Sequence, residues 1–375
     1  MIDNYYDHSI KGGERSKRGD SRKKQHALHI TNGEVKVPTD WKAFLKSGRN
    51  KEALLEFLVS QWKVTMKDTA LLVFATSKTS CHRLAFKPNQ LPFSTEEPEL
   101  RTDHEEADTR LIFHARHAGV PHSTVVIESS DTDVAVMALA HSKNLNCQVA
   151  LLTGTKDKKR LLDIKKMVGK LGENVVDSLI GVHAFSGCDA VSSFASKGKK
   201  THYKLIKSDA QCQQAMKALG ESFEPTDHLY SLCEAYTCKL YGQEDGDDIN
   251  KLRYKLFITK SGASQSLPPC RESLRQHINR ANFVAAVWKQ ADTGKISPPP
   301  PTCHGWILDS DDEDYSIRWH DGVVAPPDVL KTVVCGCKKT GCQGGRCACR
   351  SAKLPCTALC SCNDCENKSD HDVTE

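Results

Sequence analysis

The chain has 375 residues, enough for two or three domains, and its 52 Lys and Arg against 47 Asp and Glu give a formal net charge of +5. So small an excess excludes an overall charge signature of a nucleic-acid or membrane partner, and any such signal must be local. The apolar stretch 134–140 is far shorter than the ~18–20 residues that span a membrane, and the first residues contain no apolar signal segment, so we expect an intracellular protein with no membrane partner.

The first part of the chain is basic and then helical. Residues 11–25 are rich in Lys and Arg, which predicts a mobile arm or an exposed helix. A helix is expected from about 50 to 62, with Leu54 and Leu58 on one side, and a short buried strand follows at 70–75.

Short apolar runs and amphipathic stretches then alternate. We expect helices at 103–118, with Asp103 as the N-cap, at 134–141 and at 158–171. We expect strands at 124–128, central in a parallel sheet, at 148–152 and in the apolar run 178–185. This alternation predicts an α/β fold with a parallel sheet. His114 and His117 on the first of these helices are expected at the surface.

After about residue 208 the pattern becomes helical. A helix is expected to start at Pro268 and Pro269 and to keep one apolar face, formed by Leu274, Ile278, Ala281, Val284 and Trp288. The Pro-rich run 297–301 and the acidic run 309–314 fit no core and predict an extended linker.

Carboxylates cluster at the expected turns and helix starts of the α/β region. They are Glu106, Asp108, Asp131, Asp133 and Asp189. Ligands of open α/β sheets bind beyond the carboxyl ends of the strands, where Asp131 and Asp133 fall. Converging carboxylates can hold Mg²⁺ or Mn²⁺ for phosphodiester hydrolysis. The alternative is that these acids only complement helix dipoles and cap helices.

Three segments in this region resemble blocks of the flap-endonuclease branch of the PIN-like nucleases. They are EEADTRL, VVIESSDTDVAV and FSGCDAVSSFASKGKK, and the resemblance covers about residues 1–207. It implies a PIN-like fold and metal-site roles for Glu106, Asp108, Asp131, Asp133, Asp189 and, further upstream, Asp3. It also implies phosphate contacts for Lys11, Arg15 and Arg18, although a solvated terminal charge run is an equal alternative. The strand that carries the family's first metal-binding aspartate would precede Met1, which favours a scaffold that has lost catalysis.

The run 196–200, SKGKK, lies where that family has a turn that holds the phosphate backbone of a duplex. Its Lys197, Lys199 and Lys200 would then contact phosphates. A solvated lysine-rich loop is the alternative, because the run has one glycine where the family usually has two.

Cysteines are concentrated near the carboxyl end. Of 17 in the chain, nine lie close together, at Cys335, Cys337, Cys342, Cys347, Cys349, Cys356, Cys360, Cys362 and Cys365. Because large apolar residues are scarce there, metal ions must order the segment, and zinc is the expected ion. Three tetrahedral zincs are satisfied if six thiolates bind once and three bridge. Two separate four-cysteine sites or a disulfide knot would leave one thiol over.

This segment, from Cys335 to about Lys368, resembles the CXC domain of tesmin-type and dosage-compensation-type proteins. The resemblance implies a three-zinc module that binds DNA through the minor groove. Candidate DNA contacts are Lys338, Lys339, Arg346, Arg350 and Lys353. Arg346 occupies a position where the tesmin type often has a tyrosine, and an arginine suits a narrow minor groove.

We therefore expect five segments: a PIN-like domain (1–208), a helical extension (209–292), a linker (293–332), a CXC zinc domain (333–368) and a tail (369–375). The first functional hypothesis is a nuclear, zinc-dependent DNA-binding protein with a Mg²⁺- or Mn²⁺-dependent structure-specific nuclease, and a mobile-element origin is one interpretation of the combination. The second hypothesis is a non-catalytic DNA-binding or chromatin protein with a degenerate nuclease-like scaffold. The oligomeric state is not predicted.

Overall fold

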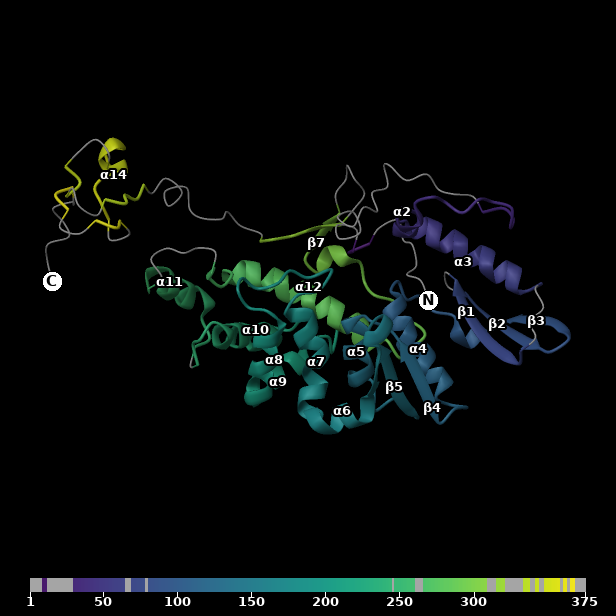
Figure 1. The fold of residues 1–375 in the computed structure, drawn as a ribbon. Helices are drawn as coiled ribbons and strands as arrows, with labels where there is room; N and C mark the ends of the chain where they lie inside the picture. Colours follow the sequence, from purple (N-terminus) through teal and green to yellow (C-terminus); the bar gives the residue numbers. More distant parts are fainter. Residues whose placement is uncertain are drawn as a thin grey trace. The chain divides into compact units, whose positions relative to one another are not determined.

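The computed structural model describes residues 9–11, 30–64, 69–77, 80–244, 246–259, 266–308, 315–320, 333–337, 341–343, 347–357, 360–362 and 365–367. The chain forms two compact units, one of residues 1–253 and 265–320, the other of residues 254–264 and 321–375 (Figure 1). Asp3, Arg15 and Arg18 lie outside the described residues, as does the acidic run 309–314. The five predicted segment boundaries remain predictions.

The first unit begins with two helices and an antiparallel sheet. The helices are α2 (Trp41–Lys46) and α3 (Gly48–Trp62), and the strands are β1 (Leu71–Ser77), β2 (Ser80–Lys87) and β3 (Gln90–Glu96). The expected helix at 50–62 is confirmed, and a strand lies where 70–75 was expected, but it is not buried as predicted, because Leu71 and Leu72 are 46% and 45% exposed. The strand does not join a parallel sheet, because it pairs antiparallel with β2, which in turn pairs antiparallel with β3. A short 3₁₀ helix, η1 (Pro98–Leu100), follows.

A second small sheet carries the α/β pattern. Its strands are β4 (Thr124–Glu128), β5 (Gln148–Thr153) and β6 (Arg160–Asp163), and its helices are α4 (Ala107–Ala118), α5 (Thr132–Ala140) and α6 (Ile164–Leu171). The α/β class is confirmed. Only the pair β4–β5 is parallel among the strand pairs of the described residues, and β4 lies at an edge, with β5 central. The expected helix at 158–171 divides into η2 (Lys156–Lys158), β6 and α6.

Two expected elements differ in kind or in extent. The apolar run 178–185 is the second half of helix α7 (Glu173–Phe185) and not a strand. All eight of its residues are buried, so it shows no amphipathic period that would distinguish a helix from a buried strand. Helix α4 begins at Ala107, because the Asp103 carboxylate does not cap it but accepts hydrogen bonds from the backbone amides of Ile296 and Ser297, at 2.8 and 2.9 Å.

From residue 199 to residue 289 the described part of the chain is helical, as expected. Its helices are α8 (Lys199–Ser208), α9 (Ala210–Ala218), α10 (Asp227–Leu240), α11 (Ile249–Thr259), which runs on into the second unit, and α12 (Arg271–Lys289). The predicted apolar face of α12 is confirmed, since its five residues are all at most 3% exposed. None of the described helices is long and apolar enough to cross a membrane.

The carboxyl end of α12 is joined to the α/β part by several polar contacts. The His141 ring lies 2.8 Å from the carbonyl of Trp288, and the His104 ring lies 2.7 Å from the carbonyl of Thr293. The Arg116 guanidinium donates to the carbonyl of Asp292 at 2.9 Å. Together with the Asp103 contacts, these bonds hold the chain after α12 against the start of α4.

Part of the expected linker packs against α12. After η4 (Pro301–Cys303), strands β7 (Trp306–Leu308) and β8 (Tyr315–Ile317) pair antiparallel. Trp306 is 1% exposed, and its ring contacts that of Phe283 on α12 at 5.5 Å between centroids. The second unit contains the cysteine segment and the short helix α14 (Ala348–Ser351).

Candidate functional site

The second unit has a core made of cysteine side chains. Six of the nine predicted ligands are at most 7% exposed: Cys335, Cys342, Cys347, Cys349, Cys356 and Cys365. The other three, with Val333, pack against them. Leu354, by contrast, is 42% exposed. The described part of this unit therefore has sulfur where an ordinary domain has aliphatic side chains.

The sulfur atoms fall into three overlapping groups of four. In each group every Sγ lies within 4.8 Å of the others. The groups are Cys335–Cys342–Cys347–Cys356, Cys335–Cys349–Cys356–Cys360 and Cys342–Cys356–Cys362–Cys365. The structure thus brings together eight of the nine predicted ligands in sets of the size that zinc requires.

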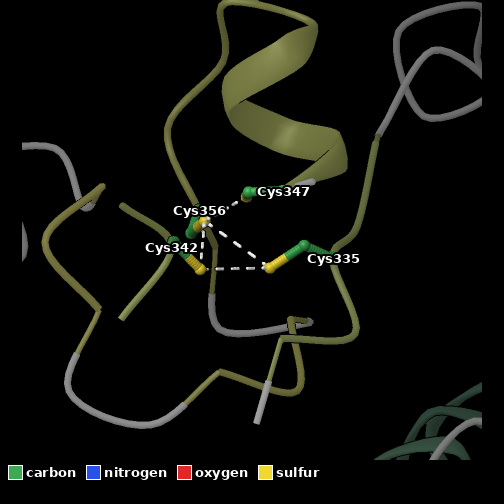
Figure 2. Close-up of side chains that lie close together, drawn as sticks. All are labelled: Cys335, Cys342, Cys347 and Cys356. Atoms are coloured by element: carbon green, nitrogen blue, oxygen red, sulfur yellow. Dashed lines mark hydrogen bonds between the residues drawn. The ribbon is translucent and has the colours of Figure 1, made fainter. Parts of the chain in front are cut away.

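The spacing within the first group fits a tetrahedral ion. The Sγ atoms of Cys335, Cys342 and Cys356 form a triangle with sides of 3.6, 3.7 and 3.8 Å (Figure 2). Cys347 lies 4.0 Å from Cys356. A tetrahedron with zinc–sulfur bonds of ~2.3 Å has edges of ~3.8 Å, so each neighbouring pair of these thiols has the separation that a shared zinc would impose.

Donors around the cluster favour thiolates. The backbone N–H of Asn367 donates to Cys365 at 3.3 Å, and its side-chain amide donates to Cys356 at 3.4 Å. Cys347 is the N-cap of α14, and the backbone N–H of Arg350 lowers the pKa of its thiol to about 7. Such outer donors orient ligands and stabilise their charged form.

The surface of the module carries basic side chains. Arg350 and Lys353 are exposed. The Arg350 guanidinium also donates to the carbonyl of Cys342 at 3.2 Å, which ties it to the cluster. Lys338, Lys339 and Arg346 lie outside the described residues. Their predicted DNA contacts, like those of Arg350 and Lys353, stay predictions.

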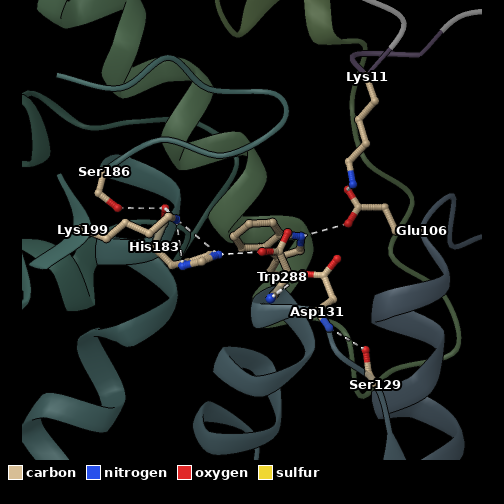
Figure 3. Close-up of polar contacts among 9 residues, drawn as sticks. Lys11, Glu106, Ser129, Asp131, His183, Ser186, Lys199 and Trp288 are labelled. Atoms are coloured by element: carbon tan, nitrogen blue, oxygen red, sulfur yellow. Dashed lines mark hydrogen bonds and ion pairs between the residues drawn. The ribbon is translucent and has the colours of Figure 1, made fainter. Parts of the chain in front are cut away.

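Three of the predicted carboxylates lie at the starts of helices α4 and α5 in the first unit, and one of them, Glu106, contacts the indole of Trp288 (Figure 3). Glu106, 7% exposed at the N-cap of α4, accepts a hydrogen bond from Trp288 Nε1 at 3.2 Å and pairs with Lys11 at 3.1 Å. Asp131 is exposed and caps α5 by accepting from the backbone amide of Asp133 at 2.9 Å. Asp133 Oδ1 in turn lies 2.8 Å from His183 Nε2.

A polar chain runs through His183. The Lys199 ammonium donates to His183 Nδ1 at 3.0 Å, so the opposite ring nitrogen carries the proton that His183 donates to Asp133. Burial opposes the charge on Asp133, but the hydrogen bond from His183 and the positive charges of Lys11 and Lys199 lower its pKa. Lys199 is therefore engaged within the unit, whereas Lys200 is exposed and Lys197 lies 5.0 Å from the ring of Tyr241.

The other predicted carboxylates lie farther along the chain. Asp108 is half-buried in the first turn of α4, and Asp189 is half-buried just after α7. Within the described residues, the groups of three or more potential ligands closer than 4.8 Å consist of cysteines alone. The metal roles of the five carboxylates, and that of Asp3, stay predictions.

A cavity of about 460 Å³ opens beside Glu106. Its walls include Glu105 and Glu106, the α12 residues Val284 and Val287, and the Pro-rich run 298–301. The run that was expected to be part of a free linker therefore forms one side of a hollow next to Glu106.

Sequence reasoning missed two residues of this neighbourhood, His183 and Trp288. Their partners lie 50 and 182 positions away along the chain. The one available signal was His183 itself, a titratable residue inside an otherwise apolar run. Lys11 was expected to face phosphates, and in the structure it contacts Glu106.

Comparison with known proteins gives one partial match. A 40-residue segment is 45% identical to Protein lin-54 of Caenorhabditis elegans, which covers 11% of this chain and 9% of that protein. No family model matches the chain, and no solved structure matches it. The partial match and the cysteine cluster fit a CXC zinc domain.

Proposed function

We propose that the chain is a zinc-dependent DNA-binding protein of the nucleus. The observation that carries the proposal is the set of three overlapping four-cysteine groups, in a unit whose described buried core consists of cysteines. The similarity to Protein lin-54 and the resemblance of the cysteine spacing to the CXC domain support DNA as the ligand. Zinc would order the backbone, and the ordered backbone would hold the basic side chains toward phosphates and the minor groove.

Three zincs with three bridging thiolates account best for the overlaps. Cys335 and Cys342 each belong to two groups and Cys356 to three, so these are the bridging ligands. If each of them joins a different pair of zincs, the zinc bound by Cys335, Cys342 and Cys347 needs a fourth ligand. Cys337 supplies it, because its thiol interacts with the thiols of those same three residues.

The test is a paired measurement of zinc content and DNA binding on the full chain. Cys347→Ser with Cys349→Ser removes one ligand from each of two zincs, so zinc should fall from about three ions per chain to one or none. DNA affinity, measured by fluorescence anisotropy, should fall at least tenfold. The matched control is Cys303→Ser, an exposed cysteine of the first unit, which should change neither. Wild-type DNA binding by the zinc-depleted variant would refute the proposal.

A second candidate function is divalent-metal-dependent cleavage of DNA. The observation that favours it is that Asp131 and Asp133 lie at the start of α5, just beyond the carboxyl end of β4, while Glu106 is buried at the start of α4. With Asp108, Asp189 and Asp3 they would hold Mg²⁺ or Mn²⁺ in a PIN-like nuclease. The pairing of Glu106 with Lys11, and of Asp133 with His183, favours the alternative of a non-catalytic scaffold.

Cleavage assays separate these two alternatives. Labelled flap, hairpin and single-stranded DNA are incubated with Mg²⁺ or Mn²⁺ and then with EDTA. A nuclease should lose all activity on Asp131→Asn with Asp133→Asn, and keep it in Glu244→Gln with Asp247→Asn, which removes the same charge from an exposed loop. DNA binding without cleavage on every substrate would leave the scaffold alternative.

A further inference from the structure

The turn between β5 and β6 in the first unit is strongly basic. Over five residues it carries four cations, Lys156, Lys158, Lys159 and Arg160, against one acid, Asp157. All five side chains are exposed. The Lys159 ammonium lies 2.6 Å from Glu128, whereas the other three cations have no ion pair with another described residue. The turn therefore presents positive charge that its described surroundings do not neutralise.

The backbone of this turn is tightly folded. Gly154 has φ +94°, and a Cβ there would lie 2.3 Å from the carbonyl oxygen of Lys158. Lys156 has φ +49°, a left-handed conformation that glycine or asparagine adopts at lower cost. If the turn served only to reverse the chain, glycine or asparagine would be favoured at position 156. A lysine there is better explained by what its side chain contacts.

The turn lies at the same end of the sheet as the acidic residues, the end at which strands β4 and β5 finish. Strands β4 and β5 run parallel, and the backbone amide of Ser129 donates to the carbonyl of Leu152 at 3.1 Å. The end of β5 is thus level with the end of β4, and Asp131 follows two residues after Ser129. The turn follows the carboxyl end of β5, and α5 begins soon after the carboxyl end of β4, so the cations and Asp131 lie at the same end of the parallel pair.

Protection of an exposed sheet edge is the main competing explanation. Cations on an edge strand discourage pairing with another sheet. Here, however, only Arg160 lies on the strand, at its first residue, whereas Lys156, Lys158 and Lys159 precede it, and β6 itself exposes Leu161 to 63%. Edge protection would place the charge on the strand and not in the turn before it.

We propose that this basic turn is a second nucleic-acid contact, which binds the phosphate backbone of DNA independently of the cysteine module. Duplex DNA carries one negative charge per ~1.7 Å, a density that suits several cations in one short turn. An acidic protein segment would also attract the turn, but DNA is the ligand proposed for the same chain. A contact to phosphates would add affinity without sequence preference.

The test is the salt dependence of DNA binding by the full chain. The variant is Lys156→Gln, Lys158→Gln, Arg160→Gln, and the control is Lys36→Gln, Lys42→Gln, Lys87→Gln, which removes the same charge from exposed positions elsewhere in the unit. Each lost phosphate contact lowers the slope of log Kd against log salt by ~0.9, so the turn variant should lose about two to three. Its affinity at 100 mM salt should fall about tenfold, with zinc content unchanged. The control should match the wild type.

The outcomes separate this inference from the proposed function. If the slope of log Kd against log salt for the turn variant equals that of the control, the turn does not contact DNA phosphates and the second contact fails. Binding of an acidic polyglutamate peptide to the turn would not rescue it. If the zinc-depleted cysteine variant still binds DNA, and loses that binding only with the turn substitutions, the role of the cysteine module fails and the second contact stands.

Discussion

Each of the two units of this chain is stabilised internally in a different way. In the first unit, large apolar side chains such as Trp288, Phe185 and Leu84 are almost fully buried, and helices α7 and α12 pack against each other. In the second, the buried side chains are cysteines that lie 3.5–4.0 Å from one another in the contacts described. Burial of apolar surface needs no ion, whereas a cluster of thiols gains its stability when a metal binds.

This difference means that the units should fail under different conditions. The first unit should lose stability when a cavity is made in its core or when a buried side chain is ionised. The second should lose stability when its metal is removed. The predictions below test this contrast, in order of decreasing effect on the free energy of unfolding.

Chelation should unfold the second unit alone. Structural zinc contributes an apparent ~10–16 kcal/mol in small modules, so a strong chelator should remove the order around Arg350 and Lys353. Trypsin should then cut after these residues, as shown by mass spectrometry, while tryptophan fluorescence from the first unit stays constant. Equal protease resistance with and without chelator would show that the module does not need metal.

Acid should destabilise the first unit through its buried histidines. Burial lowers the pKa of His114 and His202 to about 4, and that of His277 to about 3, from 6.5. The unfolded chain takes up protons below about pH 6.5 and the folded unit does so only near pH 4, so stability is full above pH 6.5 and falls as the pH drops toward 4. Each group accounts for up to about 3 kcal/mol.

Urea unfolding at several pH values, followed by tryptophan fluorescence, measures this slope. His277→Gln should flatten it, and His228→Gln, on an exposed residue, should leave it unchanged. A stability that does not vary between pH 7 and 4.5 would contradict the burial of these imidazoles.

Removal of a large apolar side chain should affect only the first unit. Trp288→Ala empties a site that is 1% exposed and should cost ~3–5 kcal/mol in urea unfolding, with zinc content unchanged. Phe93→Ala is the control, because that ring is 62% exposed and should cost little. A drop in bound zinc with Trp288→Ala would show that the two units are not independent.

The smallest expected effect concerns Asp131, which caps α5. Asp131→Ala should cost about 1 kcal/mol, because a backbone donor loses its acceptor, whereas Asp131→Asn keeps an acceptor and should cost less. Thermal unfolding of the first unit compares the two variants. Equal losses would show that charge, and not capping, is what Asp131 supplies to stability.

The sequence predicted the cysteine site well because its ligands are local. All nine lie within one short segment, so their spacing alone indicates a shared cluster, and the structure brings eight of them into groups of four. Which thiols group together could not be predicted, because Cys335 and Cys356 meet across 21 positions only in the folded unit.

The α/β part was predicted less completely, for physical reasons. Strand 124–128 and helix 134–141 have clear patterns and are confirmed. Helix α7 was taken for a strand because its second half is buried on every side. His114 was expected at the surface, but the antiparallel sheet, which was not predicted, covers it, and Thr76 of β1 lies 3.1 Å from its ring.

The contacts of Asp103 with Ile296 and Ser297 also bear on the order of folding. They join parts of the chain 193 and 194 positions apart, and the Trp288–Glu106 bond spans 182. Closing such long loops costs entropy that only later contacts repay. During synthesis the α/β part therefore emerges long before the segment that completes its acidic edge. We expect these contacts to stay unformed on the ribosome until Ser297 has left the exit tunnel. The fold of the first unit is then completed by the part of the chain that is synthesised last.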